Sequence, residues 1–166
     1  MKHLSKAVLV VAGLALAACS QPHLDDANVG PNNGSGEFGS VSDPTSVAYF
    51  NETIGDRVLF KVDQSTLSEE GRLVVLAQAN WLLANTAYTA VIEGHADEQG
   101  TREYNLALGA RRAASVQELL VAQGVAANRL RTVSYGKERP IEVCSQEACY
   151  AQNRRSVTVL TAGLSG

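Results

Sequence analysis

The sequence predicts an α/β domain, an α+β sandwich in which helices pack on a mixed sheet. Strand-like and helix-like segments alternate along the chain, 45% of the 166 residues are apolar, and this length accommodates about one domain. Three cysteines are too few for a domain built on disulfides or for a four-cysteine zinc site. The net charge of −3 contains no basic surplus, which disfavours nucleic acid as a partner.

A short apolar strand at residues 58–60 opens the domain. A helix follows, because Thr66 or Ser68 can cap its first turn and apolar residues recur with helical spacing up to Asn85. Residues 88–95 are β-branched and aromatic, which is typical of a strand. These three elements make up the first half of the domain.

The second half of the domain continues the alternation. A second helix begins near Thr101 and ends before Gly124, a residue that suits the position just after a helix. A third strand covers residues 130–135, and a short helix at residues 146–153 precedes the last strand at residues 156–161. Strands that alternate with helices in this way favour a mixed sheet covered by helices.

The N-terminus has the pattern of a secretory signal peptide over residues 1–18. Basic residues precede an apolar run that is too short for a membrane span, which needs about 20 residues. Two alanines then precede Cys19, which resembles a bacterial lipobox, in which the cysteine is lipidated. The alternative is an ordinary signal with a chance cysteine. By resemblance to sorted lipoproteins, Ser20 in place of aspartate favours the outer membrane.

A change of composition separates this leader from the domain. Residues 20–46 are rich in glycine, proline, serine and asparagine and contain few large apolar residues. Such a segment buries too little surface to offset the entropy lost on ordering. We therefore expect a lipidated cysteine and flexible tether over residues 19–46, and one folded domain over residues 47–166.

Residues 93–114 contain more polar groups than a strand-turn-helix junction requires. Period-two alternation puts Glu93, His95 and Asp97 on one face of a strand. A metal site is disfavoured, because no second histidine lies near His95 in the sequence. A glycosidase pair of Glu93 and Asp97 is disfavoured too, because four residues of strand separate them by about 13 Å.

The following helix puts Asn105, Gly109 and Arg112 on one stripe. Glycine inside a helix costs about 1 kcal/mol relative to alanine, so Gly109 indicates close packing against the backbone. Asp97 beside Arg112 suits a zwitterionic ligand, because arginine pairs with a carboxylate and aspartate with an ammonium group. The alternative is that these two residues simply pair with each other.

The segment GHADEQGTREYNLALGARRAASV, which begins at Gly94, is similar to the core motif of OmpA-like domains. Residues 131–140 and the run Asn153-Arg154-Arg155 agree with this resemblance, as do the lipobox and the tether. The resemblance covers residues 55–160. It implies the OmpA-like β-α-β-α-β-(α)-β fold, a protein that is not an enzyme, and no cofactor.

The resemblance also implies a ligand, because family members hold peptidoglycan non-covalently through the diaminopimelate of its stem peptide. It assigns this binding to five residues, namely Asp97, Arg112, Asn105, Leu108 and Asp63. The stretch around Asp63 is poorer in aspartate and aromatic residues than is usual in the family. The resemblance further implies the periplasmic protein TolB and the Tol complex as partners.

These observations predict a non-catalytic anchor between the outer membrane and the cell wall, and a wall-degrading hydrolase is the alternative. We expect Asp97→Ala or Arg112→Ala to abolish wall binding without unfolding the domain. Export would put Cys144 and Cys149 in an oxidising compartment, where a disulfide could close the short loop between them. Two free thiols are the alternative.

Overall fold

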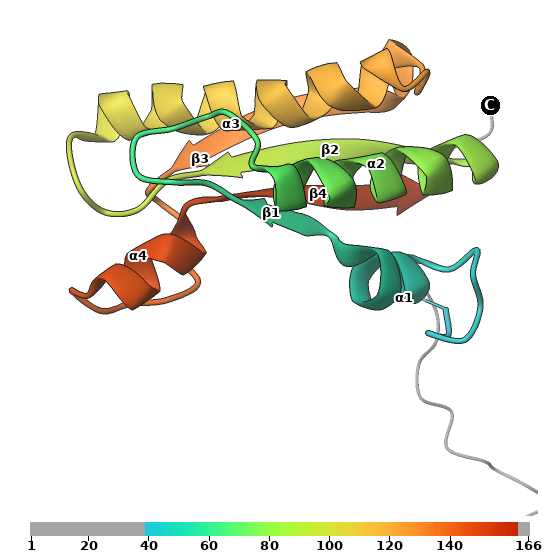
Figure 1. Ribbon diagram of the computed structural model, residues 1–166, viewed down its shortest axis with the longest axis horizontal. Coiled ribbons are helices and arrows are strands. Elements are labelled where there is room, and N and C mark those ends of the chain that lie inside the picture. The colour runs from blue at the N-terminus through green and yellow to red at the C-terminus, as the bar shows by residue number, and fades with distance from the viewer. Residues whose placement is uncertain (1–38, 163–166) are drawn as a thin grey trace, which may run out of the picture. The chain divides into compact units, whose positions relative to one another are not determined.

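The computed structural model describes residues 39–162, so Cys19 and most of the predicted tether lie outside the described residues. Four strands form one mixed sheet in the order β1-β4-β2-β3, and Figure 1 shows α2 and α3 together on one of its faces. This confirms the predicted fold class. The strands are β1 (Arg57–Leu59), β2 (Tyr88–His95), β3 (Leu130–Gly136) and β4 (Arg155–Ala162). The helices are α1 (Val47–Tyr49), the π-helix η1 (Phe50–Gly55), α2 (Glu69–Ala84), α3 (Arg102–Ala122), the 3₁₀-helix η2 (Ala127–Arg129) and α4 (Glu147–Asn153).

Strand β2 is central, pairing in parallel with β3 and antiparallel with β4. Strand β4 in turn pairs antiparallel with β1, so the last strand of the chain lies between the first and the second. The register of β2 against β3 shifts between Gly94 and His95, at the end of β2 that leads into the segment before α3. The end of the regular ladder therefore coincides with the start of the polar cluster predicted from the sequence.

The two long helices begin and end where their sequences predict. The Ser68 hydroxyl accepts a hydrogen bond from the Gly71 amide at the start of α2, and the Thr101 hydroxyl accepts one from the Tyr104 amide at the start of α3. After α3, Gly124 has a φ of +100°, a conformation that glycine adopts without strain. These caps set where each helix starts relative to the sheet.

Helix α3 approaches the sheet closely at two facing glycines. A Cβ atom on Gly94 of β2 would lie 1.8 Å from the carbonyl oxygen of Gly109 on α3. A Cβ atom on Gly109 would lie 2.4 Å from the Ser134 hydroxyl oxygen and 2.8 Å from the Gly94 oxygen. The close packing predicted at Gly109 is therefore confirmed, and it brings the first turns of α3 down beside the end of β2.

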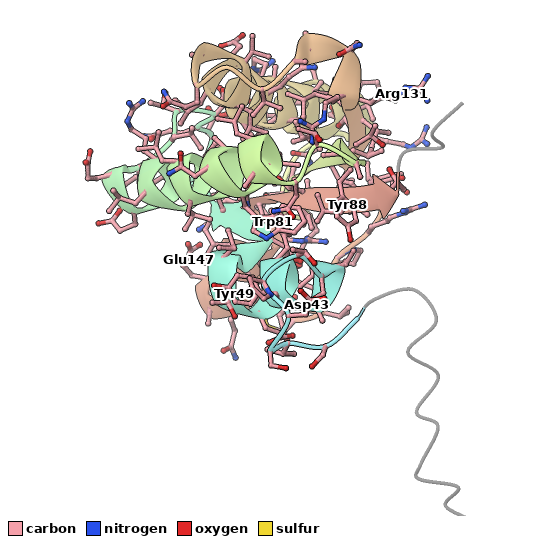
Figure 2. All side chains as sticks on the ribbon, turned by 90° about the vertical axis from the view of Figure 1, so that its right-hand side faces the viewer. Asp43, Tyr49, Trp81, Tyr88, Arg131 and Glu147 are labelled. Atoms are coloured by element: carbon pink, nitrogen blue, oxygen red, sulfur yellow. A yellow bond between two sulfur atoms is a disulfide. The ribbon has the colours of Figure 1, made fainter. Side chains whose placement is uncertain are left out.

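An aromatic cluster attaches the N-terminal turns, which the sequence did not predict as helical, to α2. The Phe50 ring is completely buried, 5.0 Å from that of Trp81, and the Tyr88 ring lies 5.2 Å beyond. The Trp81 indole donates a hydrogen bond to the Pro44 carbonyl at 2.8 Å, and the Tyr88 hydroxyl donates one to the Thr45 backbone carbonyl at 3.1 Å. Figure 2 shows Trp81 and Tyr88 beside these turns. Within residues 39–162, no helix is long and apolar enough to cross a membrane.

The contact between Gly94 and Gly109 yields a test, because helix propensity and packing predict changes of opposite sign in the free energy of unfolding of Gly109→Ala. Propensity alone predicts that Gly109→Ala stabilises the domain by about 1 kcal/mol. We expect Gly109→Ala to lower the free energy of unfolding by about 2 kcal/mol instead, because the added methyl group overpacks the contact with β2. The exposed neighbour Ala110 is the control, since Ala110→Gly should cost only about 1 kcal/mol. Urea denaturation measures both, and a stabilised Gly109→Ala would contradict the packing argument.

Candidate functional site

A cleft of about 270 Å³ lies between the segment after β1, the turn after β2 and the first turns of α3. All of the residues assigned to ligand binding line it, namely Asp63, Asp97, Asn105, Leu108 and Arg112. Four of them are buried and make up what we call the floor: Asp97, Asn105, Leu108 and Arg112. Asp63 belongs to the exposed rim, together with Val62, Gln99, Gly100 and Tyr104.

Asp97 lies just beyond the end of β2 and is only 7% exposed. Its Oδ1 atom accepts a hydrogen bond from the Gln99 amide at 3.2 Å, which fixes the turn after the strand. Its Oδ2 atom forms an ion pair with Nη1 of Arg154 at 3.0 Å. The alternative in which Asp97 pairs with Arg112 is therefore wrong, because the partner of Asp97 is Arg154.

Arg112 is completely buried beneath the cleft. Its Nε donates to the Gln64 carbonyl and its Nη1 to that of His95, both at 2.8 Å, while Nη2 donates to that of Lys61 at 3.2 Å. A guanidinium has five N–H groups, so these three bonds leave two. Burial lowers the pKa of Arg112 to about 10 although Asp97 opposes that shift, and the group remains cationic at neutral pH.

The rim contains Tyr104, a residue that the sequence analysis did not assign to the site. Tyr104 is 45% exposed, and its hydroxyl donates a hydrogen bond to the carboxylate of Asp63. This bond raises the pKa of Tyr104. Asp63 has a φ of +57°, a left-handed conformation that aspartate tolerates better than most residues. The bond from α3 thus ties down the sharp turn after β1.

Asn105 holds the opposite wall of the cleft in place. Its side-chain amide is buried and donates to the Gln99 carbonyl at 2.7 Å. From outside, the Lys137 ammonium donates to the Gly100 carbonyl at 2.7 Å. The apolar side chain of Leu108 lies one helical turn after Asn105 and completes the floor. Asn105 therefore has a structural contact of its own, in addition to any contact with a ligand.

His95 and Glu93 lie on the face of the sheet that points away from the helices, so the prediction that they share a face with Asp97 is wrong. Strand β2 ends at His95, so the alternation of its side chains does not extend to Asp97, which lies in the following turn and lines the cleft. His95 is buried near the rings and charges of Tyr135, Arg139 and Arg155, and its Nε2 lies 3.6 Å from a Glu93 oxygen. The described residues contain no cluster of three or more metal-ligating side chains.

Arg154 is the residue of this site whose role the sequence analysis missed. Its guanidinium donates to Asp97, and also to the carbonyl of Phe60 at 3.2 Å. The signal was present, because Arg154 stands in the run Asn153-Arg154-Arg155 that agrees with the family pattern. Its partner lies 57 positions away in the chain, however, and only the insertion of β4 between β1 and β2 brings the two together.

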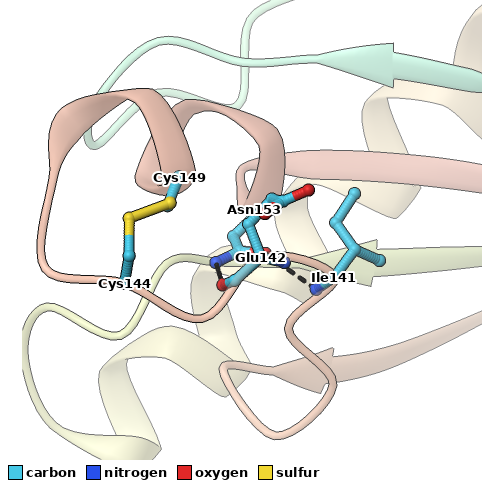
Figure 3. The surroundings of a disulfide bond; sticks show 5 residues. All are labelled: Ile141, Glu142, Cys144, Cys149 and Asn153. Carbon is cyan, nitrogen blue, oxygen red and sulfur yellow. Dashed lines mark hydrogen bonds between the residues drawn. A yellow bond between two sulfur atoms is a disulfide. The ribbon is translucent and has the colours of Figure 1, made fainter.

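The structure joins Cys144 and Cys149 by a disulfide, with Cα atoms 5.9 Å apart. This distance lies within the usual range for disulfides. The bond closes the segment that leads into α4, and Figure 3 shows it beside the contacts of Asn153. The predicted lipidation site, Cys19, lies outside the described residues.

Comparisons with known proteins agree with this fold and site. The model of the OmpA family matches residues 59–154. The peptidoglycan-associated lipoprotein of Mesorhizobium japonicum is 47% identical, over 93% of this chain and 90% of that protein. That of Rhizobium meliloti is 46% identical, over 92% of this chain and 85% of that protein.

Solved structures give the same result. The crystal structure of the peptidoglycan-associated lipoprotein from Burkholderia pseudomallei matches with a TM-score of 0.65 and 34% identity, over 73% of this chain and 98% of that one. The C-terminal domain of Helicobacter pylori MotB has a TM-score of 0.61 at 21% identity, over 66% of this chain and 86% of that one, and shares the fold.

The helix-covered mixed sheet with a charged cleft at one end defines an α/β domain of the OmpA-like class. The matches in sequence are then decisive, since they extend over more than nine-tenths of the chain. The chain belongs to the OmpA family, in the group of the peptidoglycan-associated lipoproteins.

Burial of His95 makes the stability of the domain sensitive to acid. Burial, aided by the charges of Arg155 and Arg139, lowers the pKa of His95 from 6.5 to about 4. Well above pH 6.5 the imidazole is neutral in the folded and in the unfolded protein. As the pH falls from 6.5 toward 4, the unfolded chain binds a proton that the folded domain does not, and this favours unfolding. We expect the free energy of unfolding to fall by about 2 kcal/mol between pH 7 and pH 5. His95→Phe should remove most of this loss of stability. If urea denaturation showed the same dependence of the unfolding free energy on pH in His95→Phe as in the wild type, the explanation would be wrong.

The contacts of Arg112 change what its removal is expected to do. Arg112→Ala would leave three backbone carbonyls without their donor and a cavity beneath the cleft. We therefore expect it to lower the free energy of unfolding by about 3 kcal/mol or more, in contrast to the sequence-based expectation of an intact domain. Arg111→Ala, at the exposed neighbouring position, is the control and should change stability by less than about 0.5 kcal/mol. Equal stability of the two variants in urea would show that the buried contacts contribute little.

Proposed function

We propose that the domain binds peptidoglycan non-covalently, through the diaminopimelate residue of its stem peptide. The observation that carries this proposal is the cleft itself, in which a buried carboxylate and a buried guanidinium line one small space. Diaminopimelate ends in an ammonium group and a carboxylate on the same carbon atom. Membership of the OmpA family and the name of the relatives support peptidoglycan as the polymer that is bound.

Each charged group of the floor has a role in this proposal. The Asp97 carboxylate accepts hydrogen bonds from the ammonium group, because its two present partners leave lone pairs free. The Arg112 guanidinium offers its two remaining N–H groups to the carboxylate. Since Arg112 is completely buried, the segment from Lys61 to Gln64 has to move before direct contact is made. Leu108 contacts the aliphatic chain of the ligand.

The same proposal assigns the rest of the chain to attachment. Lipid on Cys19 holds the protein in the outer membrane, and the part of residues 20–46 that precedes the contacts of Pro44 and Thr45 with the domain forms the tether to a domain in the periplasm. Many copies facing one polymer turn weak single sites into firm attachment. We infer that TolB and the Tol–Pal system are the protein partners, in maintaining the envelope and in cell division. No catalytic step enters this function, since the chain belongs with the peptidoglycan-associated lipoproteins, a non-enzymatic structural group.

The test is co-sedimentation of residues 20–166 with purified diaminopimelate-type sacculi. We expect Asp97→Asn to weaken binding by roughly tenfold or more, since it removes a charged hydrogen-bonding partner of the ammonium group. Glu98→Gln is the matched control, because it removes the same charge from an exposed neighbour in the same turn and should bind like the wild type. Absence of wild-type binding would refute the function, whereas equal weakening by both variants would indicate only nonspecific attraction of charges. Release of soluble fragments from the sacculi would favour the hydrolase instead.

A further inference from the structure

We propose that Glu147 on α4 is a positioning residue for the wall-binding cleft, acting through Arg154 on Asp97, and that the Cys144–Cys149 disulfide holds Glu147 in place. This inference rests on the proposed function, because its effect is on ligand binding. It extends the site beyond the family motif, to a helix outside the cleft. Figure 3 shows how this helix is attached to the segment before it.

Arg154 lies between two carboxylates, with its side chain only 5% exposed. Its Nη1 donates to Asp97 at 3.0 Å, and its Nη2 donates to Glu147, whose second oxygen lies 3.4 Å from Nη1. Burial acts to lower the pKa of Arg154, but the hydrogen bonds to Glu147 and Asp97 outweigh it, so the pKa stands above its usual value. The guanidinium is therefore a permanent cation shared by two anions.

How the N–H groups of Arg154 are shared between Asp97 and Glu147 determines how many lone pairs of Asp97 remain free for a ligand. Only one nitrogen of Arg154 donates to Asp97, although the preferred arrangement of an arginine and a carboxylate uses two parallel hydrogen bonds. Glu147 holds the other terminal nitrogen. If Glu147 were neutral, Arg154 would be free to turn both nitrogens onto Asp97 and occupy lone pairs that the ligand's ammonium group needs.

Glu147 has this effect only if α4 is held firmly, and two devices hold it. The helix has seven residues, and Gln146 at its N-terminus makes no side-chain cap, so it has little stability of its own. The disulfide closes its N-terminal end. At its other end the buried Asn153 side chain accepts from the amides of Ile141 and Glu142, at 2.9 and 3.1 Å, and donates to the Glu142 carbonyl at 2.7 Å.

The experiment uses residues 20–166 and the tripeptide L-alanyl-γ-D-glutamyl-meso-diaminopimelate. Calorimetric titration should show roughly three- to tenfold weaker binding for Glu147→Gln, as expected when a carboxylate partner of a buried arginine is lost. Glu142→Gln is the matched control, since it removes the same charge from an exposed residue on the segment before α4 and should bind within about twofold of the wild type. Cys144→Ser combined with Cys149→Ser should weaken binding in the same direction as Glu147→Gln.

A second measurement separates positioning from general destabilisation. Without ligand, the ¹³C resonance of the Asp97 carboxyl carbon should move in Glu147→Gln and stay in place in Glu142→Gln, while the melting temperatures of both stay near that of the wild type. An unmoved resonance and unchanged affinity in Glu147→Gln would refute the role of Glu147. Wild-type affinity in the double serine variant would refute the role of the disulfide. Absence of tripeptide binding by the wild type refutes the proposed function instead, and the carboxyl resonance still tests the contact.

Discussion

The cleft depends on one buried interaction, the guanidinium of Arg112 bonded to three backbone carbonyls. Two of these carbonyls, of Lys61 and Gln64, belong to the segment after β1, and the third, of His95, ends β2. Arg112 itself comes from the middle of α3. A single side chain thus joins three segments that are far apart in the sequence, namely the segment after β1, the end of β2 and α3. Because carbonyls carry no net charge, the positive charge of Arg112 is held in place without being neutralised.

The close approach of α3 to β2 is the condition for this arrangement. Gly94 and Gly109 let the helix backbone come down onto the strand, and Arg112 follows Gly109 by three residues on the same helix. A side chain on either glycine would lift the helix and draw the guanidinium away from the His95 carbonyl. Geometry set by two residues without side chains therefore determines the position of the most important charge in the cleft.

The sequence predicted most of the elements but not how distant parts of the chain combine. The caps Ser68 and Thr101 mark the starts of α2 and α3 because their effect is local, within one helical turn. The turns α1 and η1 were missed although Ser46 caps α1 locally, because they are short and Phe50 is packed against the distant Trp81. Asp97 was predicted as a site residue, but its partner Arg154 was not, since that contact depends on where β4 enters the sheet. The face of Asp97 was mistaken because β2 ends at His95, and the alternation of a strand does not hold for a residue in the turn beyond it.

The balance of buried charge indicates which ligands the cleft can accept. Two buried arginines, Arg112 in the floor and Arg154 paired with Asp97, accompany the single buried carboxylate of Asp97, while the exposed Glu147 forms an ion pair with Arg154. Asp97 is therefore satisfied by Arg154 on one side, and Arg112 is the cation without an anionic partner. A simple cation would find only one buried carboxylate, that of Asp97, which is already paired with Arg154, and a simple anion would leave Asp97 facing it. A ligand with both charges on one carbon satisfies each group in turn, which is why the arrangement favours the end of an amino acid over either ion alone.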